Sequence, residues 1–173
     1  ALDDVSLAFR KSEFVCVLGH SGCGKTTLLN IIGGLDQYTS GDLLINGVST
    51  KQYNDKDWDT YRNHSIGFVF QNYNLLPILT AAENICAPMS IGGKAVDALY
   101  FRELCETLAI TDRLHHLPAE MSGGECQRVA VARAMITRPA VLFADEPTGN
   151  LDKNTAAELM TLLKKAQREF SQT

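Results

Sequence analysis

The sequence predicts an α/β fold with a mostly parallel central sheet, a small antiparallel β element and a helical insert. Short apolar runs alternate with stretches of helical spacing, a pattern typical of strands joined by crossover helices. The predicted strands are EFVCVL at 13–18, GDLLINGV at 41–48, SIGFVFQ at 65–71 and AVLFADEP at 140–147. The region between the last two runs is largely helical.

The first two predicted strands are expected to lie in different structures, one in the buried sheet and one in a hairpin. The run at 13–18 is compact and apolar, which predicts a buried strand, and the helix after it should stop at Gly33 and Gly34 because glycine commonly ends helices. Asn46-Gly47 is a strong hairpin signal, so the run at 41–48 should form the antiparallel element.

Helix starts are marked by capping boxes, in which a hydroxyl and a carboxylate satisfy the first free amides of a helix. Thr80 with Glu83, and Ser122 with Glu125, both fit this pattern. A last helix is predicted at 154–170, because apolar residues recur there at helical spacing.

The length and composition of the chain limit the classes of protein to which it can belong. The chain has 173 residues, of which 45% are hydrophobic, which suits a single domain with a sizeable core. A net charge of −4 without charged blocks argues against nucleic acid as a partner. No run is long and apolar enough to cross a bilayer, and no signal peptide is evident, which predicts a cytoplasmic chain. Five cysteines without a C-x-x-C pair suggest free thiols.

The segment GHSGCGKTT at 19–27 matches G-x-x-x-x-G-K-[ST] between a predicted strand and a predicted helix. Its glycines allow backbone N–H groups to converge on phosphate oxygens, and the helix dipole adds to that field. Lys25 is expected to reach the β- and γ-phosphates, and Thr26 to bind Mg²⁺. The predicted nucleotide-binding residues are Gly19, His20, Ser21, Gly22, Cys23, Gly24, Lys25, Thr26 and Thr27. The alternative is a glycine-rich turn without a ligand.

Two carboxylates, Asp145 and Glu146, follow the apolar run VLFA at the carboxyl end of a predicted strand. Open α/β sheets bind ligands at that edge. Asp145 suits the Mg²⁺ shell, and Glu146 suits a general base that takes a proton from the attacking water. The alternative is a strand that happens to end in an acidic turn.

The segment MSGGECQRVAVARAM at 121–135 closely resembles the signature of the ATP-binding cassette (ABC) family, with a glutamate where glutamine is usual. FVFQ and GNLD resemble two further family motifs, the Q-loop and the D-loop. The resemblance implies that Gln71 senses Mg²⁺ and the attacking water. Gln71, Lys25 and Glu146 are then the expected catalytic residues. It implies that Ser122, Gly123, Gly124 and Glu125 face a nucleotide held by another subunit, and that Asp152 lies at the dimer interface. A simple capping box would explain Ser122 and Glu125 but not the two glycines.

The resemblance covers nearly the whole chain. IGGLD, SIGFVFQNYNLLP and DEPTGNLD are closest to the branch that exports lipoproteins, macrolides and antimicrobial peptides. It implies one ABC-type P-loop cassette, with a nucleotide-binding core at 1–71 and 135–173 and a helical subdomain at 72–134. The family's adenine-stacking aromatic and switch histidine have no match here. We therefore expect an incomplete cassette with a gap in its sheet, and little ATPase activity from the isolated chain.

The leading hypothesis is an ATPase subunit that binds ATP with Mg²⁺ in a head-to-tail dimer, most simply a homodimer, and drives an integral-membrane permease. The segment after Gln71 is the expected permease contact, with exposed Tyr73 and Leu76 as anchors. Such a subunit is cytoplasmic and peripheral on the inner face of the membrane. The alternatives are a non-transport ABC ATPase, in chromosome maintenance or on the ribosome, and a nucleotide-binding module without turnover.

Overall fold

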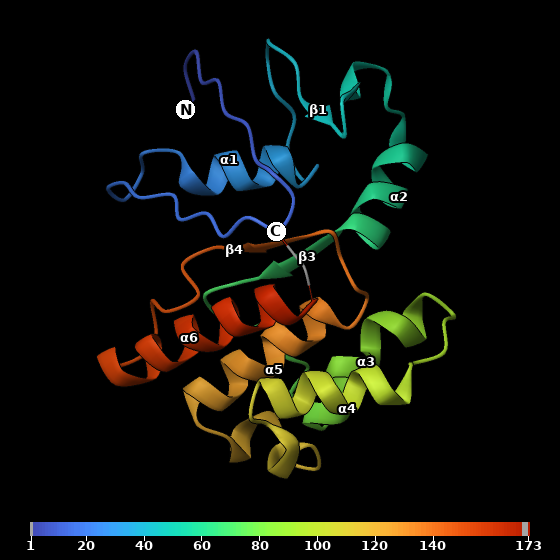
Figure 1. The fold of residues 1–173 in the computed structure, drawn as a ribbon, viewed down its shortest axis with the longest axis vertical. Helices are drawn as coiled ribbons and strands as arrows, with labels where there is room; N and C mark the ends of the chain where they lie inside the picture. Colours follow the sequence, from blue (N-terminus) through green and yellow to red (C-terminus); the bar gives the residue numbers. More distant parts are fainter. Residues whose placement is uncertain (1, 171–172) are drawn as a thin grey trace.

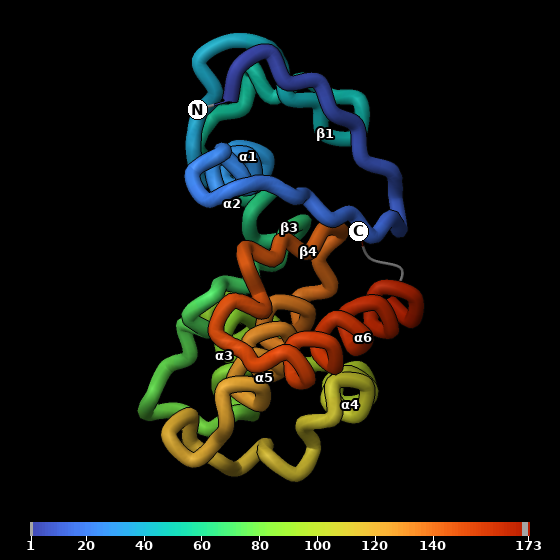
Figure 2. The backbone as a smooth tube through the Cα atoms, turned by 90° about the vertical axis from the view of Figure 1, so that its left-hand side faces the viewer, coloured from blue at the N-terminus to red at the C-terminus, as the bar shows by residue number. Residues whose placement is uncertain are grey.

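A two-stranded parallel sheet lies at the middle of the molecule, between two groups of helices (Figures 1 and 2). The computed structural model describes residues 2–170 and Thr173. Its elements are α1 Lys25–Ile32, β1 Leu44–Ile45, β2 Val48–Ser49, η1 Thr50–Gln52, α2 Asp55–Ser65, β3 Ile66–Val69, α3 Ala81–Ile91, α4 Ala98–Thr107, η2 Thr111–Arg113, η3 Pro118–Glu120, α5 Gly123–Met135, β4 Val141–Ala144 and α6 Lys153–Phe170.

Strands β3 and β4 pair in parallel, from Ile66 opposite Val141 to Val69 opposite Ala144. The Asp145 amide continues the ladder by donating to the Val69 carbonyl at 3.0 Å. The prediction of parallel strands within 65–71 and 140–147 is confirmed, although each strand is shorter than its apolar run. The carboxyl end of β4 thus leads directly into the acidic pair.

The larger core lies on one face of this sheet, where α3, α4, α5 and α6 pack together (Figure 2). Ile85, Leu104 and Val131 are fully buried there. Helix α5 approaches β3 so closely that a Cβ on Gly67 would collide with the Ala134 carbonyl oxygen. The helical region predicted between the two strands therefore forms the main hydrophobic core together with α6.

The opposite face carries a smaller core around Tyr61, Ile66 and Phe143. Leu29 of α1 packs against it, and the Tyr61 hydroxyl donates to the Ile32 carbonyl at 3.1 Å. Burial raises the pKa of Tyr61 to about 12. This small cluster fixes α1, and with it the glycine segment, above the sheet.

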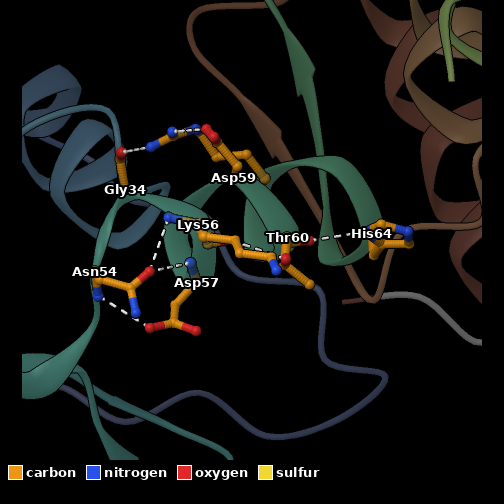
Figure 3. A network of polar contacts seen from close by, with 8 residues as sticks. Gly34, Asn54, Lys56, Asp57, Asp59, Thr60 and His64 are labelled. Atoms are coloured by element: carbon orange, nitrogen blue, oxygen red, sulfur yellow. Dashed lines mark hydrogen bonds and ion pairs between the residues drawn. The ribbon is translucent and has the colours of Figure 1, made fainter.

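Helix α2 was not predicted from the sequence. Its start is a capping box, in which the Asn54 side chain accepts from the amides of Lys56 and Asp57 while the Asp57 carboxylate accepts from the Asn54 amide (Figure 3). Farther along, His64 Nδ1 lies 3.0 Å from the Thr60 carbonyl oxygen (Figure 3). The Asn-x-x-Asp spacing was the available signal.

Several local predictions are confirmed. Strands β1 and β2 form an antiparallel hairpin, and Asn46 and Gly47 both take positive φ, as its tight turn requires. Helices α3 and α5 start at the two predicted capping boxes, α1 ends at Gly33, and α6 covers the predicted range.

The prediction of a buried strand at 13–18 is wrong. The segment has no regular secondary structure and pairs with no described strand, and Phe14 and Leu18 are 39% and 86% exposed. A strand needs a neighbour for its amides and carbonyls. Thr173 is bonded both to the β4 region and to Ser12, which precedes this segment. Its backbone bonds Ala140 and Leu142, and its hydroxyl accepts from the Ser12 amide. The expected gap in the sheet stays a prediction.

Candidate functional site

The glycine segment lies at the amino end of α1. Gly22 and Gly24 take φ values of 80° and 97°, a backbone conformation that favours glycine. Gly24 is the N-cap of α1 and supplies no side chain, so the first amides of the helix keep free donors. An open nest of N–H groups at a helix start is suited to a phosphate.

Lys25 folds back across this segment. Its Nζ donates to the carbonyl oxygens of Gly19 and His20, both at 3.0 Å, and lies 3.9 Å from Glu146 Oε1. The Lys25 side chain is only 17% exposed, while that of Glu146 is 52% exposed. The loop thus holds the Lys25 ammonium group between two of its own carbonyls and Glu146.

The Thr26 hydroxyl donates to Asp145 Oδ2 at 2.9 Å, which joins the start of α1 to the end of β4. A hydroxyl and a carboxylate oxygen side by side fit Mg²⁺, which prefers oxygen ligands. No group of three His, Cys, Asp or Glu side chains suited to a metal occurs in the described part of the chain. Phosphate oxygens and water would therefore complete the shell of an ion held here.

Glu146 follows Asp145 with φ of 47°, in the left-handed region that is uncommon for residues other than glycine. Such backbone geometry turns the chain sharply after β4 and leaves the Glu146 carboxylate open to solvent. Strained positions of this kind cluster at functional sites. The structure therefore brings Lys25, Thr26, Asp145 and Glu146 to one edge of the sheet.

Gln71 lies apart from that group. Its amide nitrogen donates to Asn150 Oδ1 at 3.4 Å, while the Asn150 side chain donates to the Gln71 carbonyl at 3.0 Å and to Asn72 Oδ1 at 3.1 Å. Gly149 packs against the Gln71 side chain, and a Cβ there would lie 2.6 Å from Gln71 Nε2. No hydrogen bond between described residues joins Gln71 to Thr26 or Asp145.

The residues of the signature-like segment form a bonded cap on α5. Glu125 Oε2 accepts from the Ser122 amide at 2.7 Å and from the Ser122 hydroxyl at 2.8 Å. Glu125 Oε1 accepts from Arg113 Nε at 2.6 Å. The bonds from Ser122, followed by that from Arg113, lower the pKa of Glu125 from 4.5 to about 2. The carboxylate is ionised at neutral pH.

The two glycines of this segment have a packing role within the chain. A Cβ on Gly123 would lie 2.8 Å from the Tyr73 hydroxyl, and one on Gly124 would collide with the Thr155 methyl group. Close packing against Tyr73 and α6 therefore accounts for the small residues that the capping box alone leaves unexplained.

A hollow of about 250 Å³ opens beside this cap. It is lined by Ser122, Gly123, Gly124, Arg128, Asn150, Leu151, Asp152, Thr155 and Glu158. Asp152 accepts from the Thr155 hydroxyl at 2.6 Å and from the Asn154 and Thr155 amides, so it caps α6. These bonds, with that of the Thr155 hydroxyl foremost, lower the pKa of Asp152. No hydrogen bond or ion pair within the described ranges joins residues 19–27 to residues 122–125.

The loop after Gln71 is hydrogen-bonded to Asn84 on its inner side and exposes apolar side chains on its outer side. Leu76 and Ile78 are 48% and 84% exposed, whereas Tyr73 is half-buried, contrary to expectation, because its ring turns back onto Gly123. Fully buried Asn84 accepts from the Leu76 amide at 2.7 Å, and its amide group donates to the carbonyls of Leu76, Leu79 and Thr80.

Three side chains that organise this region were missed from the sequence: Asn150, Arg113 and Arg133. Arg133 donates to the carbonyls of Tyr73 and Asn74, both of which have positive φ. Each of the three acts on a segment distant in the chain. Only Asn150 had a local signal, its place inside GNLD.

Comparisons with known proteins found a matching family and several similar chains. The family model for "ABC transporter" matches residues 2–149. A lipoprotein-releasing system ATP-binding protein LolD from Alcanivorax borkumensis is 45% identical over 94% of this chain and 72% of its own length. The LolD of Bordetella avium is 45% identical over 97% of this chain and 74% of its own. An uncharacterised ABC transporter ATP-binding protein of Thermotoga maritima is 47% identical over 95% and 71%.

Two solved structures of the cassette MJ0796 are also similar. The structure titled as a dimeric bacterial ABC transporter cassette aligns with a TM-score of 0.81 at 39% identity, covering 96% of this chain and 75% of that one. A dimeric post-hydrolysis state of the same cassette, bound to ADP and Pi, aligns with a TM-score of 0.80 at 40% identity, with the same coverage of both chains.

Proposed function

This chain belongs to the ABC transporter ATP-binding family, and we propose that it is the ATP-hydrolysing subunit of an exporter or of a lipoprotein- or peptide-handling system. As a member of the family it is an ABC-type ATPase that uses ATP with Mg²⁺. The similarity to proteins named as lipoprotein-releasing supports the choice of system. The observation that carries the proposal is the meeting of Lys25, Thr26, Asp145 and Glu146 at one sheet edge.

In this proposal the open amides of residues 19–27 and Lys25 hold the phosphates of ATP. Lys25 exchanges the carbonyls of Gly19 and His20 for phosphate oxygens, which are stronger acceptors because they are charged. Thr26 and Asp145 would hold Mg²⁺, and Gln71, which is bonded to Asn150 here, would be a further ligand. When bound, the ion supplies Lewis-acid stabilisation of the phosphate charge. Glu146 accepts the proton of the attacking water.

We further propose that a second copy of the chain completes each site. Ser122, Gly123, Gly124 and Glu125 would face the nucleotide of the partner chain, with Asp152 at the interface. Ser122, Gly123, Gly124 and Asp152 line one hollow together with Arg128, which supports this. The similarity to a cassette solved as a dimer also supports it.

The permease contact is proposed at the loop of Leu76 and Ile78, whose apolar side chains are exposed beside the rigid Asn84 anchor. No helix among residues 2–170 has the length and apolar character to cross a bilayer. We propose a cytoplasmic subunit that reaches the inner membrane face through the permease. The division into a core at 1–71 and 135–173 and a helical subdomain at 72–134 is part of this proposal.

Replacing the proposed base tests the function most directly. Glu146→Gln in the complete subunit should retain MgATP binding while phosphate release falls by about 10²- to 10⁴-fold, since the amide has similar volume but cannot accept the proton. Glu103→Gln, an exposed position on α4, is the matched control and should leave turnover unchanged.

Turnover near the wild-type rate in Glu146→Gln would exclude Glu146 as the base. The unsubstituted subunit should also release phosphate when a permease is present. If it binds MgATP but releases no phosphate with each permease that is tried, the chain is a nucleotide-binding module rather than a transport ATPase.

A further inference from the structure

Arg113, which lies in none of the motifs found in the sequence, forms an ion pair with Glu125 of the signature-like segment. Arg113 ends the short helix η2, and its Nε lies 2.6 Å from Glu125 Oε1 in the first turn of α5. The Arg113 side chain is 42% exposed, whereas that of Glu125 is 18% exposed. Among the described residues, this is the single ion pair that Glu125 makes. The pair is therefore specific in geometry and partly shielded from water.

The same carboxylate also sets the conformation of Ser122. While Oε1 is bonded to Arg113, Oε2 accepts from the amide and the hydroxyl of Ser122 at 2.7 and 2.8 Å. Arg113, Glu125 and Ser122 thus form one chain of hydrogen bonds that ends at the start of α5. The orientation of the Ser122 hydroxyl depends on where the Glu125 carboxylate is held.

A carboxylate at this place presents an electrostatic problem. Under the proposed function, the start of α5 meets a phosphate of the partner's nucleotide, and this inference rests on that function. The amides of Gly123 and Gly124 suit an anion, because the first N–H groups of a helix have no acceptor within it. A bare negative charge on Glu125, one turn away, would repel the same anion. Its charge must be compensated locally.

We propose that Arg113 is a positioning residue for the ATP-driven pairing of two chains. It compensates the charge of Glu125 and holds the carboxylate against Ser122, so that the start of α5 can accept the partner's phosphate. The Arg113 backbone is itself anchored, because its carbonyl accepts from the His116 amide and its own amide donates to the Ile110 carbonyl. The guanidinium acts through Glu125 and does not contact the nucleotide.

A purely structural role for the pair makes a different prediction. If Arg113 only ties η2 to α5, its loss should weaken the protein equally whether residue 125 is charged or neutral. If it compensates a charge, its loss should matter only while residue 125 carries that charge. Glutamine at 125 preserves the capping box, because its side chain still accepts from Ser122.

The experiment measures MgATP-dependent dimerisation of the complete subunit by analytical ultracentrifugation, in a Glu146→Gln parent that retains its nucleotide. The variants are Arg113→Gln, Arg113→Lys, Glu125→Gln and the double change Arg113→Gln/Glu125→Gln. Binding of a fluorescent ATP analogue to the single chain and the thermal unfolding midpoint are recorded for each. The parent and Glu103→Gln set the reference.

Arg113→Gln should weaken MgATP-dependent dimerisation by about tenfold while nucleotide binding by the single chain changes by less than about twofold. Arg113→Lys keeps the charge and should stay within about threefold of the parent. In the Glu125→Gln background, Arg113→Gln should cost less than about twofold. Glu125→Gln alone should dimerise at least as tightly as the parent.

Equal losses in the two backgrounds, or no loss from Arg113→Gln, would overturn the inference. If Arg113→Gln does not fold, Glu125→Gln decides, and a loss of dimerisation beyond about threefold in that variant counts against charge compensation. A parent that fails to dimerise with MgATP removes the proposed function and this inference together. A parent that dimerises but is indifferent to Arg113 removes the inference alone.

Discussion

Helices α1 and α5 both begin at glycine-containing motifs, yet they are held in different ways. Helix α1 has eight residues and none of them is buried, whereas nine of the thirteen residues of α5 are buried. The contrast extends beyond the helices, since Gly33 and Thr50 are the buried positions among residues 2–52. The region around α1 is held by glycine conformations, polar bonds and the small apolar cluster beneath Leu29, whereas the α5 region is held by packing in the larger core.

This difference predicts which substitutions should affect ligand binding and which should affect folding. Side chains around α1 should affect ligand binding with little effect on folding, because few of them bury apolar surface. Side chains packed on α5 should affect the free energy of unfolding first. The four predictions below test that division in order of decreasing effect.

Lys25→Ala should weaken MgATP binding by at least about a hundredfold, because truncating one partner of a charged pair costs about 2–5 kcal/mol. The free energy of unfolding should change by less than about 1 kcal/mol, since the two carbonyls that Lys25 bonds are exposed and can bind water. Lys51→Ala, in the same region, is the control. Calorimetric titration showing unchanged ATP affinity would contradict the assignment.

Leu104→Ala should lower the free energy of unfolding by about 2–5 kcal/mol, because Leu104 is a fully buried member of the larger core. Leu99→Ala is a matched control on the same helix, and its 68% exposure predicts a change within about 0.5 kcal/mol. Urea unfolding measures both. Similar losses at the two positions would mean that α4 packs differently from this description.

Asn84→Ala should destabilise the chain by about 1–3 kcal/mol, because it removes the fully buried Asn84 side chain and leaves the part-buried Leu76 amide without its acceptor. It should also increase amide hydrogen exchange at 76–80, the proposed permease contact. Asn154→Ala serves as the control, since Asn154 is exposed at the start of α6. Unchanged exchange at 76–80 would show that Asn84 does not hold this loop.

The smallest expected effect is a pH dependence. Because the folded protein lowers the pKa of Glu125 from 4.5 to about 2, its stabilising effect is complete above about pH 4.5 and is lost as the pH falls toward 2. Glu125→Gln should therefore reduce the loss of unfolding free energy between pH 6 and 3 by about 1 kcal/mol. Parallel curves for the parent and the variant in acid denaturation would rule this out.

Sequence reasoning succeeded where a structure is encoded locally. The capping boxes at Thr80 and Ser122 and the Asn46-Gly47 turn each place their donors and acceptors within a few residues, so a short window contains the whole interaction. Lys25, Thr26 and Asp145 also lie at one edge of the sheet, as expected, because the start of α1 and the end of β4 meet there. Their roles toward ATP stay predictions.

The predictions from sequence failed where the structure of a segment depends on a partner far away in the chain. Whether 13–18 becomes a strand is decided by a neighbour beside it, which apolar composition cannot supply. Helix α2 was missed because its sequence is polar and only Tyr61 is buried, which leaves little periodicity to detect. The Arg113–Glu125 pair joins single residues of two different elements, and no spacing rule connects them.

Gly67 carries a consequence for how freely this sequence can vary. It is the one residue of β3 without a side chain, and α5 lies directly against it, with the Ala134 carbonyl where a Cβ would stand. A backbone oxygen cannot rotate out of the way as a side chain can. Even a methyl group at 67 would require the helix or the sheet to shift, whereas Ile66 and Val69 can exchange for other apolar residues of similar size. The least replaceable position of the strand is thus the one that contributes no side chain of its own.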